Sequence, residues 1–372
     1  MRGLLFLAVA WGEVFFEEDF SGDWEQRWTR GQPPGKPSSE MGAWRVTPGE
    51  WYADADRDRG LSASEDSRFY AISAPLDAVA TSRDKTLVVQ FTAKMPQMES
   101  LSCGGGYIKL LPPGFEPATF SGEDAYQLMF GPDVCGKKGR IHAILRHEEE
   151  NLQKTEELSL KKRDQMTHLY TWALHPNGTY SISVDLEPLR HGEMLRSDWP
   201  LPQPQIDDPS DAKPDDWVDD AEIDDPEAVK PDGYDDMPAE IADETATRPD
   251  DWDDDDDGAW EPPLVPNPQY AGPWRPPRVA NPAYRGAWRA RQMDNPKYRG
   301  DVQLAAYDVA YVGFEIWVVQ SGTIFDNVLI TDDVELARAR GETLWRATSS
   351  AEVAAKEAWA RARDFTSSSD SK

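Results

Sequence analysis

The segment Ile206-Asp207-Asp208-Pro209, followed by Lys213-Pro214-Asp215-Asp216-Trp217, returns as Ile223-Asp224-Asp225-Pro226 and Lys230-Pro231-Asp232-Gly233-Tyr234. A weaker third copy ends in Arg248-Pro249-Asp250-Asp251-Trp252. A second unit then repeats with a period of 14 residues, and its copies begin at Trp260, Trp274 and Trp288. Each of these copies continues with Asn-Pro, a Tyr and a closing Gly. Such periodicity indicates stacked units rather than a globular core.

Charge predicts how the two sets of repeats meet. Residues 206–257 hold 24 acidic and 3 basic residues, whereas residues 258–300 hold 2 acidic and 7 basic residues. The prolines exclude a regular helix and interrupt any sheet ladder. We therefore expect an extended antiparallel hairpin that turns near 253–258, with rungs of Trp or Tyr on which Lys or Arg stems pack. The alternative is a disordered, solvated tail, against which the regular aromatic spacing argues.

Charge and length also bound the compartment and the partners. The 372 residues carry a formal net charge of −29, most of it in the acidic repeats, which disfavours binding to nucleic acid or anionic membranes and suits cations such as Ca²⁺. Residues 1–12 are typical of a short secretory signal, the alternative being a buried first strand. No stretch reaches the length of a membrane span. Cys103 and Cys135 are the only cysteines, and a secretory chain favours a disulfide between them.

The remaining chain predicts a sandwich of two antiparallel sheets into which the repeats are inserted. Short apolar or alternating runs separated by Gly, Pro and Asn are typical of this architecture. We expect strands at 86–92, 106–111, 125–130, 140–145, 167–174, 179–186, 309–320 and 323–330. The stretch from Asp332 is helical in composition, and Ser349 to Glu352 is a candidate capping box that opens the run to Arg363.

Residues that could carry chemistry favour binding over catalysis. Glu222, Asp224 and Glu227 have the carboxylate spacing of one group of sandwich glycosidases, but Pro226 breaks the strand that such a site needs. The five histidines show no zinc spacing with the cysteines. A sugar-binding face needs aromatic rings with a few fixed polar groups, and the candidates are Tyr107, Lys109, Tyr126 and Asp133. The alternative is an ordinary half-polar strand face.

The repeats, three of each kind in this order, resemble the proline-rich arm of the calreticulin family. The resemblance extends to the globular part through the segments 103–110, 126–135, 167–171 and 321–327. It implies a mainly β fold: a legume-lectin-like (concanavalin-type) jelly-roll β-sandwich with an inserted proline-rich hairpin arm and a C-terminal α-helix. The implied parts are a signal peptide (1–12), a globular lectin domain in two pieces (13–203 and 301–332), the arm (204–300) and a C-terminal helix with a polar tail (333–372).

The resemblance also implies site residues. The sugar-contacting positions of the family fall on Tyr107, Lys109, Tyr126, Asp133 and Glu315. The last is a departure, because the family has Asp there and Glu places the carboxylate one methylene further out. Positions that line the sugar fall on Met129, Ile144 and Trp317.

A structural calcium site and a partner site are implied in the same way. The calcium site combines the side chain of Asp326 with backbone oxygens at Asp19, Arg57 and Arg59. The arm tip, which in the family docks a disulfide-isomerase-like oxidoreductase, falls on Asp255, Asp257 and Trp260. The alternative for the tip is a solvated turn.

The expected function is a Ca²⁺-binding lectin chaperone, not an enzyme, that acts as a monomer in the lumen of the endoplasmic reticulum. Its partners would be monoglucosylated N-glycoproteins, unfolded polypeptides and a disulfide-isomerase-family oxidoreductase. The alternative is a secreted or lumenal calcium-binding scaffold with a weakened sugar site, and a glycosidase is a third reading. The sequence ends in Ser371-Lys372 without the family's usual acidic tail or Lys-Asp-Glu-Leu signal, which leaves retention and secretion both open.

Overall fold

The computed structural model describes residues 12–369, apart from 53, 101, 251, 253–257 and 299–305. The chain divides into two compact units, one made of residues 1–204 with 295–372 and the other of Gln205–Asp294. Because the expected signal peptide occupies 1–12, it lies almost wholly outside the described residues.

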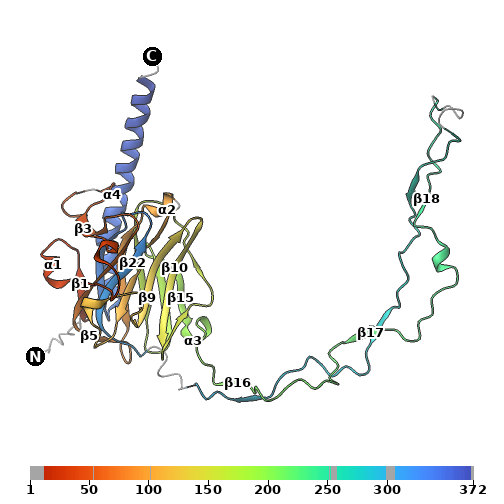
Figure 1. The fold of residues 1–372 in the computed structure, drawn as a ribbon, viewed down its shortest axis with the longest axis horizontal. Helices are drawn as coiled ribbons and strands as arrows, with labels where there is room; N and C mark the ends of the chain where they lie inside the picture. The colour runs from red at the N-terminus through yellow and green to blue at the C-terminus, as the bar shows by residue number, and fades with distance from the viewer. Residues whose placement is uncertain are drawn as a thin grey trace, which may run out of the picture. The chain divides into compact units, whose positions relative to one another are not determined.

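The first unit contains two antiparallel sheets, which we call sheet A and sheet B (Figure 1). Sheet A has eight strands in the described chain, and β1 joins it at β23. In spatial order, sheet A consists of β15 (Glu187–Met194), β14 (Thr179–Val184), β13 (Thr167–Leu174), β6 (Leu87–Lys94), β23 (Ile324–Thr331), β4 (Gly60–Ala63) and β3 (Trp44–Thr47), with β1 (Val14–Glu18) beside β23.

Sheet B has nine strands in the same part of the chain. Its path runs through β11 (Glu150–Gln153), β10 (Lys138–His147), β9 (Leu128–Cys135), β7 (Cys103–Gly105), β22 (Asp308–Val318), β5 (Arg68–Thr81) and β2 (Thr29–Arg30). Two further strands lie off this path, β8 (Ile108–Leu111) between β22 and β9, and β12 (Leu158–Ser159) beside β10. The chain returns to sheet B after the arm, since β22 pairs with β5 over most of its length.

Alternation along the strands explains the core. In β22, the side chains of Val312, Phe314, Ile316 and Val318 are all fully buried between the sheets. Phe314 stacks on Phe325 of sheet A, with ring centroids 4.0 Å apart. Burying a side chain of this size contributes about 1.5–3 kcal/mol, so one apolar face per strand fixes the register. The predicted sandwich is confirmed.

The strand predictions differ from the structure mainly at their ends. The strand expected at 167–174 has these bounds, and the one expected at 323–330 is a single strand with a register shift between Asp326 and Leu329. The strand expected at 125–130 begins only at Leu128, and the one expected at 106–111 begins only at Ile108. Short helical segments connect the strands: α1 (Trp24–Arg27), η1 (Ser38–Glu40), α2 (Gln97–Ser100), η2 (Pro117–Thr119) and α3 (Leu195–Asp198).

The C-terminal helix α4 (Val334–Ser369) packs on β13, β6 and β23 of sheet A (Figure 1). The expectation that Ser349 to Glu352 caps its start is wrong. The helix begins fifteen residues earlier, where the carboxylate of Asp333 accepts a hydrogen bond from the amide of Leu336 at 2.9 Å. Ser350 lies within the helix and donates to the carbonyl of Arg346, and Glu352 is buried against sheet A.

The second unit is a hairpin held by three short antiparallel pairs. They are β16 (Gln205–Asp207) with β21 (Gln292–Asp294), β17 (Glu222–Asp224) with β20 (Arg278–Ala280), and β18 (Glu240–Ala242) with β19 (Leu264–Pro266), and η3 (Tyr234–Asp236) lies between β17 and β18. Acidic and basic repeats thus pair as expected (Figure 1). The turn is predicted near 253–258, and residues 253–257 of it lie outside the described residues.

Tryptophans of two acidic repeats donate to glycine carbonyls, Trp217 across the hairpin and Trp252 to a residue six positions further along the chain. The indole of Trp217 donates to the carbonyl of Gly286 at 2.8 Å, and that of Trp252 donates to Gly258 at 2.8 Å. The guanidinium carbon of Arg285 lies 6.0 Å from the ring centre of Trp217. This is the contact between an Arg side chain and an aromatic ring that we expected for a rung. Gly258, Gly272 and Gly286 all have φ between 84° and 88°, a backbone conformation that favours glycine.

Candidate functional site

The candidate sugar residues lie on the face of sheet B that points away from the sandwich core. Strand β8 carries Lys109, which stands opposite Met129 on β9 and Gly313 on β22. Alternation sends Ile108 and Leu110 into the core and Lys109 to the other face, as expected. A separate apolar cluster covers this outer face and contains Tyr126, Met129, Ile144, Leu111, Phe115, Phe120 and Ala71.

An ion pair between a buried lysine and a partly exposed glutamate lies on this face. The ammonium of Lys109 lies 2.8 Å from Oε2 of Glu315 on β22, and Lys109 is only 4% exposed. The same ammonium lies 5.0 Å from the ring centre of Tyr126 and 6.0 Å from that of Phe120. A charge at this depth needs such a partner, because an isolated buried ion is costly. Phe120, which sequence reasoning missed, gave no signal because it lies in a loop segment after η2.

Asp133 lies on the same face, toward the end of β9. Its Oδ2 is 3.4 Å from Nε2 of His142 and 3.5 Å from the guanidinium of Arg140, both on β10. The ring of Tyr107 packs edge-on against His142, with centroids 5.8 Å apart. Burial, together with the charges of Glu315 and Asp133, raises the pKa of Tyr107 well above its usual range, so its hydroxyl stays protonated and can donate.

Trp317 lies two residues beyond Glu315 on β22 and is 42% exposed. Its ring centroid is 6.2 Å from that of Phe69 on the neighbouring strand β5, and the ammonium of Lys36 lies over Phe69. Exposed aromatic rings on a sheet face are what a sugar ring can stack on. Phe69 and Lys36 carried no sequence signal, because they come from segments that only the sheet order brings beside β22.

The disulfide between Cys103 and Cys135 is present and joins the ends of β7 and β9, where the two residues stand opposite each other. It ties the strand that leads to Tyr107 to the strand that carries Asp133. Closing a loop of 32 positions constrains the unfolded chain by about 3–4 kcal/mol on the chain-entropy view.

Asp326, the expected calcium-binding side chain, has an unusual environment. Its Oδ1 is buried and has no hydrogen-bond partner, whereas Oδ2 accepts from the side-chain amide Nδ2 of Asn327 at 2.8 Å. Burial, and then the negative charges of Asp19, Asp58 and Glu18, raise the pKa of Asp326 well above its usual range. An orphaned carboxylate oxygen among other carboxylates fits a hard cation such as Ca²⁺.

The other expected calcium ligands are backbone oxygens. Gly60, which follows Arg59, approaches Asp326 so closely that a Cβ there would lie 2.9 Å from the Cβ of Asp326. The side chains of Arg57 and Arg59 face Asp54 and the carbonyl of Asp56. Across the described residues no group of three His, Cys, Asp or Glu side chains is arranged to hold a metal. A calcium site here would need main-chain oxygens in addition to the carboxylate of Asp326.

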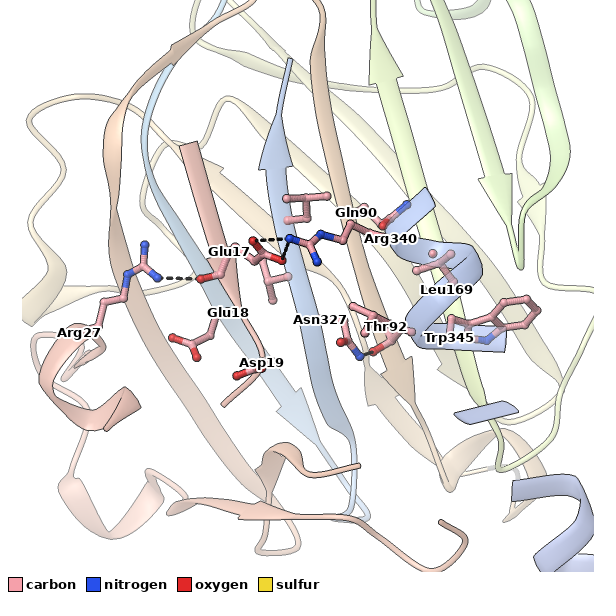
Figure 2. Close-up of a pocket in the computed structure, with 14 residues that line it drawn as sticks. Glu17, Glu18, Asp19, Arg27, Gln90, Thr92, Leu169, Asn327, Arg340 and Trp345 are labelled. Carbon is pink, nitrogen blue, oxygen red and sulfur yellow. Dashed lines mark hydrogen bonds and ion pairs between the residues drawn. The ribbon is translucent and has the colours of Figure 1, made fainter. Parts of the chain in front are cut away.

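A cavity of about 370 Å³ lies between this region and α4 (Figure 2). Its wall includes Asp19 and Asn327 on one side and Trp345 on the other. Figure 2 shows the carboxylate of Glu17 reaching the guanidinium of Arg340 on α4, an ion pair of 3.2 Å. The helix is thus tied to the strand that leads directly to Asp19.

The described helices include none that is both long and apolar enough to span a membrane. Of the expected arm-tip residues, Asp255 and Asp257 lie outside the described residues, and Trp260 lies within the hairpin unit.

Comparison with known proteins identifies the family of the chain. The sequence profile of the Calreticulin family matches residues 15–259 and 256–330. A calreticulin of Chlamydomonas reinhardtii is 48% identical over 344 residues, covering 91% of this chain and 81% of the relative. A calreticulin of Dictyostelium discoideum is 45% identical over 341 residues, covering 91% and 79%.

The solved globular domain of T. cruzi calreticulin resembles the fold with a TM-score of 0.62 and 27% identity. The match covers 94% of this chain and 99% of that domain. Sequence and fold therefore lead to the same conclusion: the chain belongs to the calreticulin family of lectin chaperones.

Proposed function

We propose that the protein is a calcium-dependent lectin chaperone of the endoplasmic reticulum lumen that binds monoglucosylated N-glycans on the outer face of sheet B. The observation that carries this is the Lys109–Glu315 ion pair, whose ammonium is buried beside the rings of Tyr126 and Phe120 while its carboxylate is partly exposed. Such a pair offers a donor and an acceptor at fixed positions, which suits two neighbouring sugar hydroxyls.

The other residues of this face take supporting roles. Tyr107 and Asp133 would hydrogen-bond the sugar, Met129 and Ile144 would form the apolar floor, and Trp317 would stack on a further sugar of the glycan. Met129 and Ile144 stand opposite each other in the β9–β10 pair and are both nearly buried, which supports the role of a floor.

Calorimetry with a monoglucosylated oligomannose tests the lectin part. The wild type should bind, whereas Tyr107→Ala and Asp133→Ala should each lose detectable binding. His191→Gln, on β15 of the other sheet, serves as a folded control that keeps binding. Unchanged binding in both variants would rule out this face as the sugar site.

The calcium part of the proposal assigns one structural ion to Asp326 with backbone oxygens of Asp19, Arg57 and Arg59. Removing calcium with EGTA should lower the thermal midpoint of the wild type, because a ligand that binds only the folded state stabilises it. The midpoint of Asp326→Ala should not respond to calcium or EGTA. An equal response in both proteins would place the ion elsewhere.

The arm would recruit a disulfide-isomerase-family oxidoreductase through Asp255, Asp257 and Trp260. The repeats supply a matched control, because Trp274 occupies the same repeat position one copy further from the turn. Trp260→Ala should weaken binding of the oxidoreductase, measured by titration with the full chain, and Trp274→Ala should leave it unchanged.

The second candidate is a calcium-binding scaffold that holds polypeptides without sugar recognition. Glu315 favours it, since its ion pair with Lys109 engages both groups in the absence of sugar. A glycan array with and without calcium separates the two, because only the lectin gives calcium-dependent signals on glucosylated glycans.

A further inference from the structure

One loop links helix α4 to the candidate calcium site. Residues 48–60 connect β3 to β4, and 53 lies outside the description. Near its start, the carbonyls of Pro48 and Trp51 accept hydrogen bonds from the ammonium of Lys94 at 3.1 and 2.6 Å. At its end, Gly60 lies against β23, where a Cβ would be only 2.4 Å from the carbonyl oxygen of Phe325. The loop therefore has little room to shift at either end.

The ammonium of Lys94 is completed by a carboxylate from α4. Glu352 Oε1 lies 2.6 Å from it, and the two side chains are 9% and 1% exposed. Glu352 also accepts from the amide and the hydroxyl of Thr167 at 2.7 and 2.6 Å. Both ions are thus satisfied by hydrogen bonds, the condition under which a buried pair is stable. Among the described residues, Glu352 is the acidic residue that forms an ion pair with Lys94.

One ring contact ties the same part of α4 directly to the loop, and a hydrogen bond fixes the helix on sheet A. The rings of Trp359 and Trp51 meet edge to face, with centroids 5.5 Å apart. Two turns before Glu352, the indole of Trp345 donates to the carbonyl of Thr167 on β13 at 2.8 Å, which fixes this part of the helix on sheet A. The loop is consequently held on one side by Trp359 and by Lys94 with its partner Glu352, and on the other side by β23.

We propose that Lys94 and Glu352 are positioning residues for the calcium site, and that docking of α4 and binding of calcium are coupled through the loop 48–60. This inference rests on the calcium site of the proposed function. The loop carries the backbone oxygens of Arg57 and Arg59, and a cation is bound tightly only if such oxygens are held in place beforehand. Without Glu352 the charge of Lys94 is buried alone, so Lys94 and the two carbonyls that it binds must rearrange.

Coupling between two binding events is reciprocal. Calcium should therefore favour the docked helix by the same factor by which the docked helix favours calcium. An undocked α4 would free the loop and lower calcium affinity, and calcium removal would loosen the helix around Glu352. The glycan face on sheet B is on the other side of the sandwich and is not part of this route.

The test measures calcium affinity by calorimetry and helix docking by amide hydrogen exchange of 345–363, on the full chain. The variants are Glu352→Gln, Lys94→Met and, as the milder change, Trp359→Ala. The control is Glu357→Gln on the same helix, where the carboxylate is largely exposed and 3.5 Å from Arg361. We expect about tenfold weaker calcium binding for Glu352→Gln and Lys94→Met, and a smaller loss for Trp359→Ala. In the wild type, calcium should slow exchange in 345–363.

The outcomes are distinct from those of the proposed function. If Asp326→Ala binds calcium as the wild type does, the site itself is misplaced. If Asp326 is needed for calcium but Glu352→Gln and Trp359→Ala keep wild-type affinity while their helices exchange faster, the coupling is refuted. Equal weakening by Glu357→Gln would also overturn it. Should Glu352→Gln fail to fold, the comparison between Trp359→Ala and Glu357→Gln decides.

Discussion

His168 on β13 should make the globular unit lose stability as pH rises through the weakly alkaline range. Its two ring nitrogens both face carboxylates: Nδ1 is 2.9 Å from Asp185 Oδ2, and Nε2 is 3.0 Å from Asp164 Oδ1. Lys162 lies 2.8 Å from the same oxygen of Asp185, and the fully buried ring of Tyr170 packs nearby. With carboxylates at both nitrogens, the ring is held as the doubly protonated imidazolium.

The structure sets the sign and the size of the effect. Burial alone would lower the pKa of His168, but the hydrogen bonds and charges of Asp164 and Asp185 outweigh it and raise the pKa from 6.5 to about 9. The folded state therefore keeps a proton that the unfolded state releases above pH 6.5. The stabilisation is complete below pH 6.5 and is lost as pH rises through 9. At about 1.4 kcal/mol per pH unit of difference between the two pKa values, the stabilisation amounts to about 3.5 kcal/mol.

Urea unfolding at pH 6.5, 7.5 and 9 measures this. If the free energy of unfolding falls by about 3 kcal/mol per molar urea, the urea midpoint of the wild type should fall by about 1 M between pH 6.5 and pH 9. His168→Gln should be less stable at pH 6.5 but show a much smaller pH dependence. His175→Gln is the matched control, because burial lowers the pKa of His175, so its contribution to stability changes with pH in the opposite sense to that of His168. Parallel pH profiles for the wild type and His168→Gln would refute the reasoning.

Two further predictions concern the arm and the loop 48–60. Trp217→Phe removes the indole donor to Gly286 and should weaken that rung of the arm by about 1 kcal/mol. Amide hydrogen exchange should become faster at 285–288 and stay unchanged in the sandwich. Unchanged exchange at 285–288 would contradict the prediction. Gly60→Ala places a Cβ 2.4 Å from the carbonyl oxygen of Phe325, so it should destabilise the globular unit by about 1–3 kcal/mol in urea, whereas Gly114→Ala, with open space around it but φ of 83°, should cost less.

Sequence by itself determined the features that depend on neighbouring residues. The opposite charges and repeat lengths of the two halves predicted the antiparallel pairs, in which Ile206 stands opposite Met293 and Ile223 opposite Val279. Alternation on β8 predicted that Lys109 and Ile108 face opposite sides of their sheet. Both patterns are local, because strand geometry sends successive side chains to opposite faces whatever the rest of the chain does.

Only the tertiary structure decided which distant residues meet. Lys109 and Glu315 are 206 positions apart, and the order β8 beside β22 brings them together. Glu352 looked like a capping residue because its neighbours are serines, yet the helix already runs through it and its carboxylate meets Lys94. The reason is energetic. A helix cap stabilises by about 1 kcal/mol, whereas burying the apolar face of a helix and pairing a buried charge involve free energies several times larger, and these decide where the helix lies.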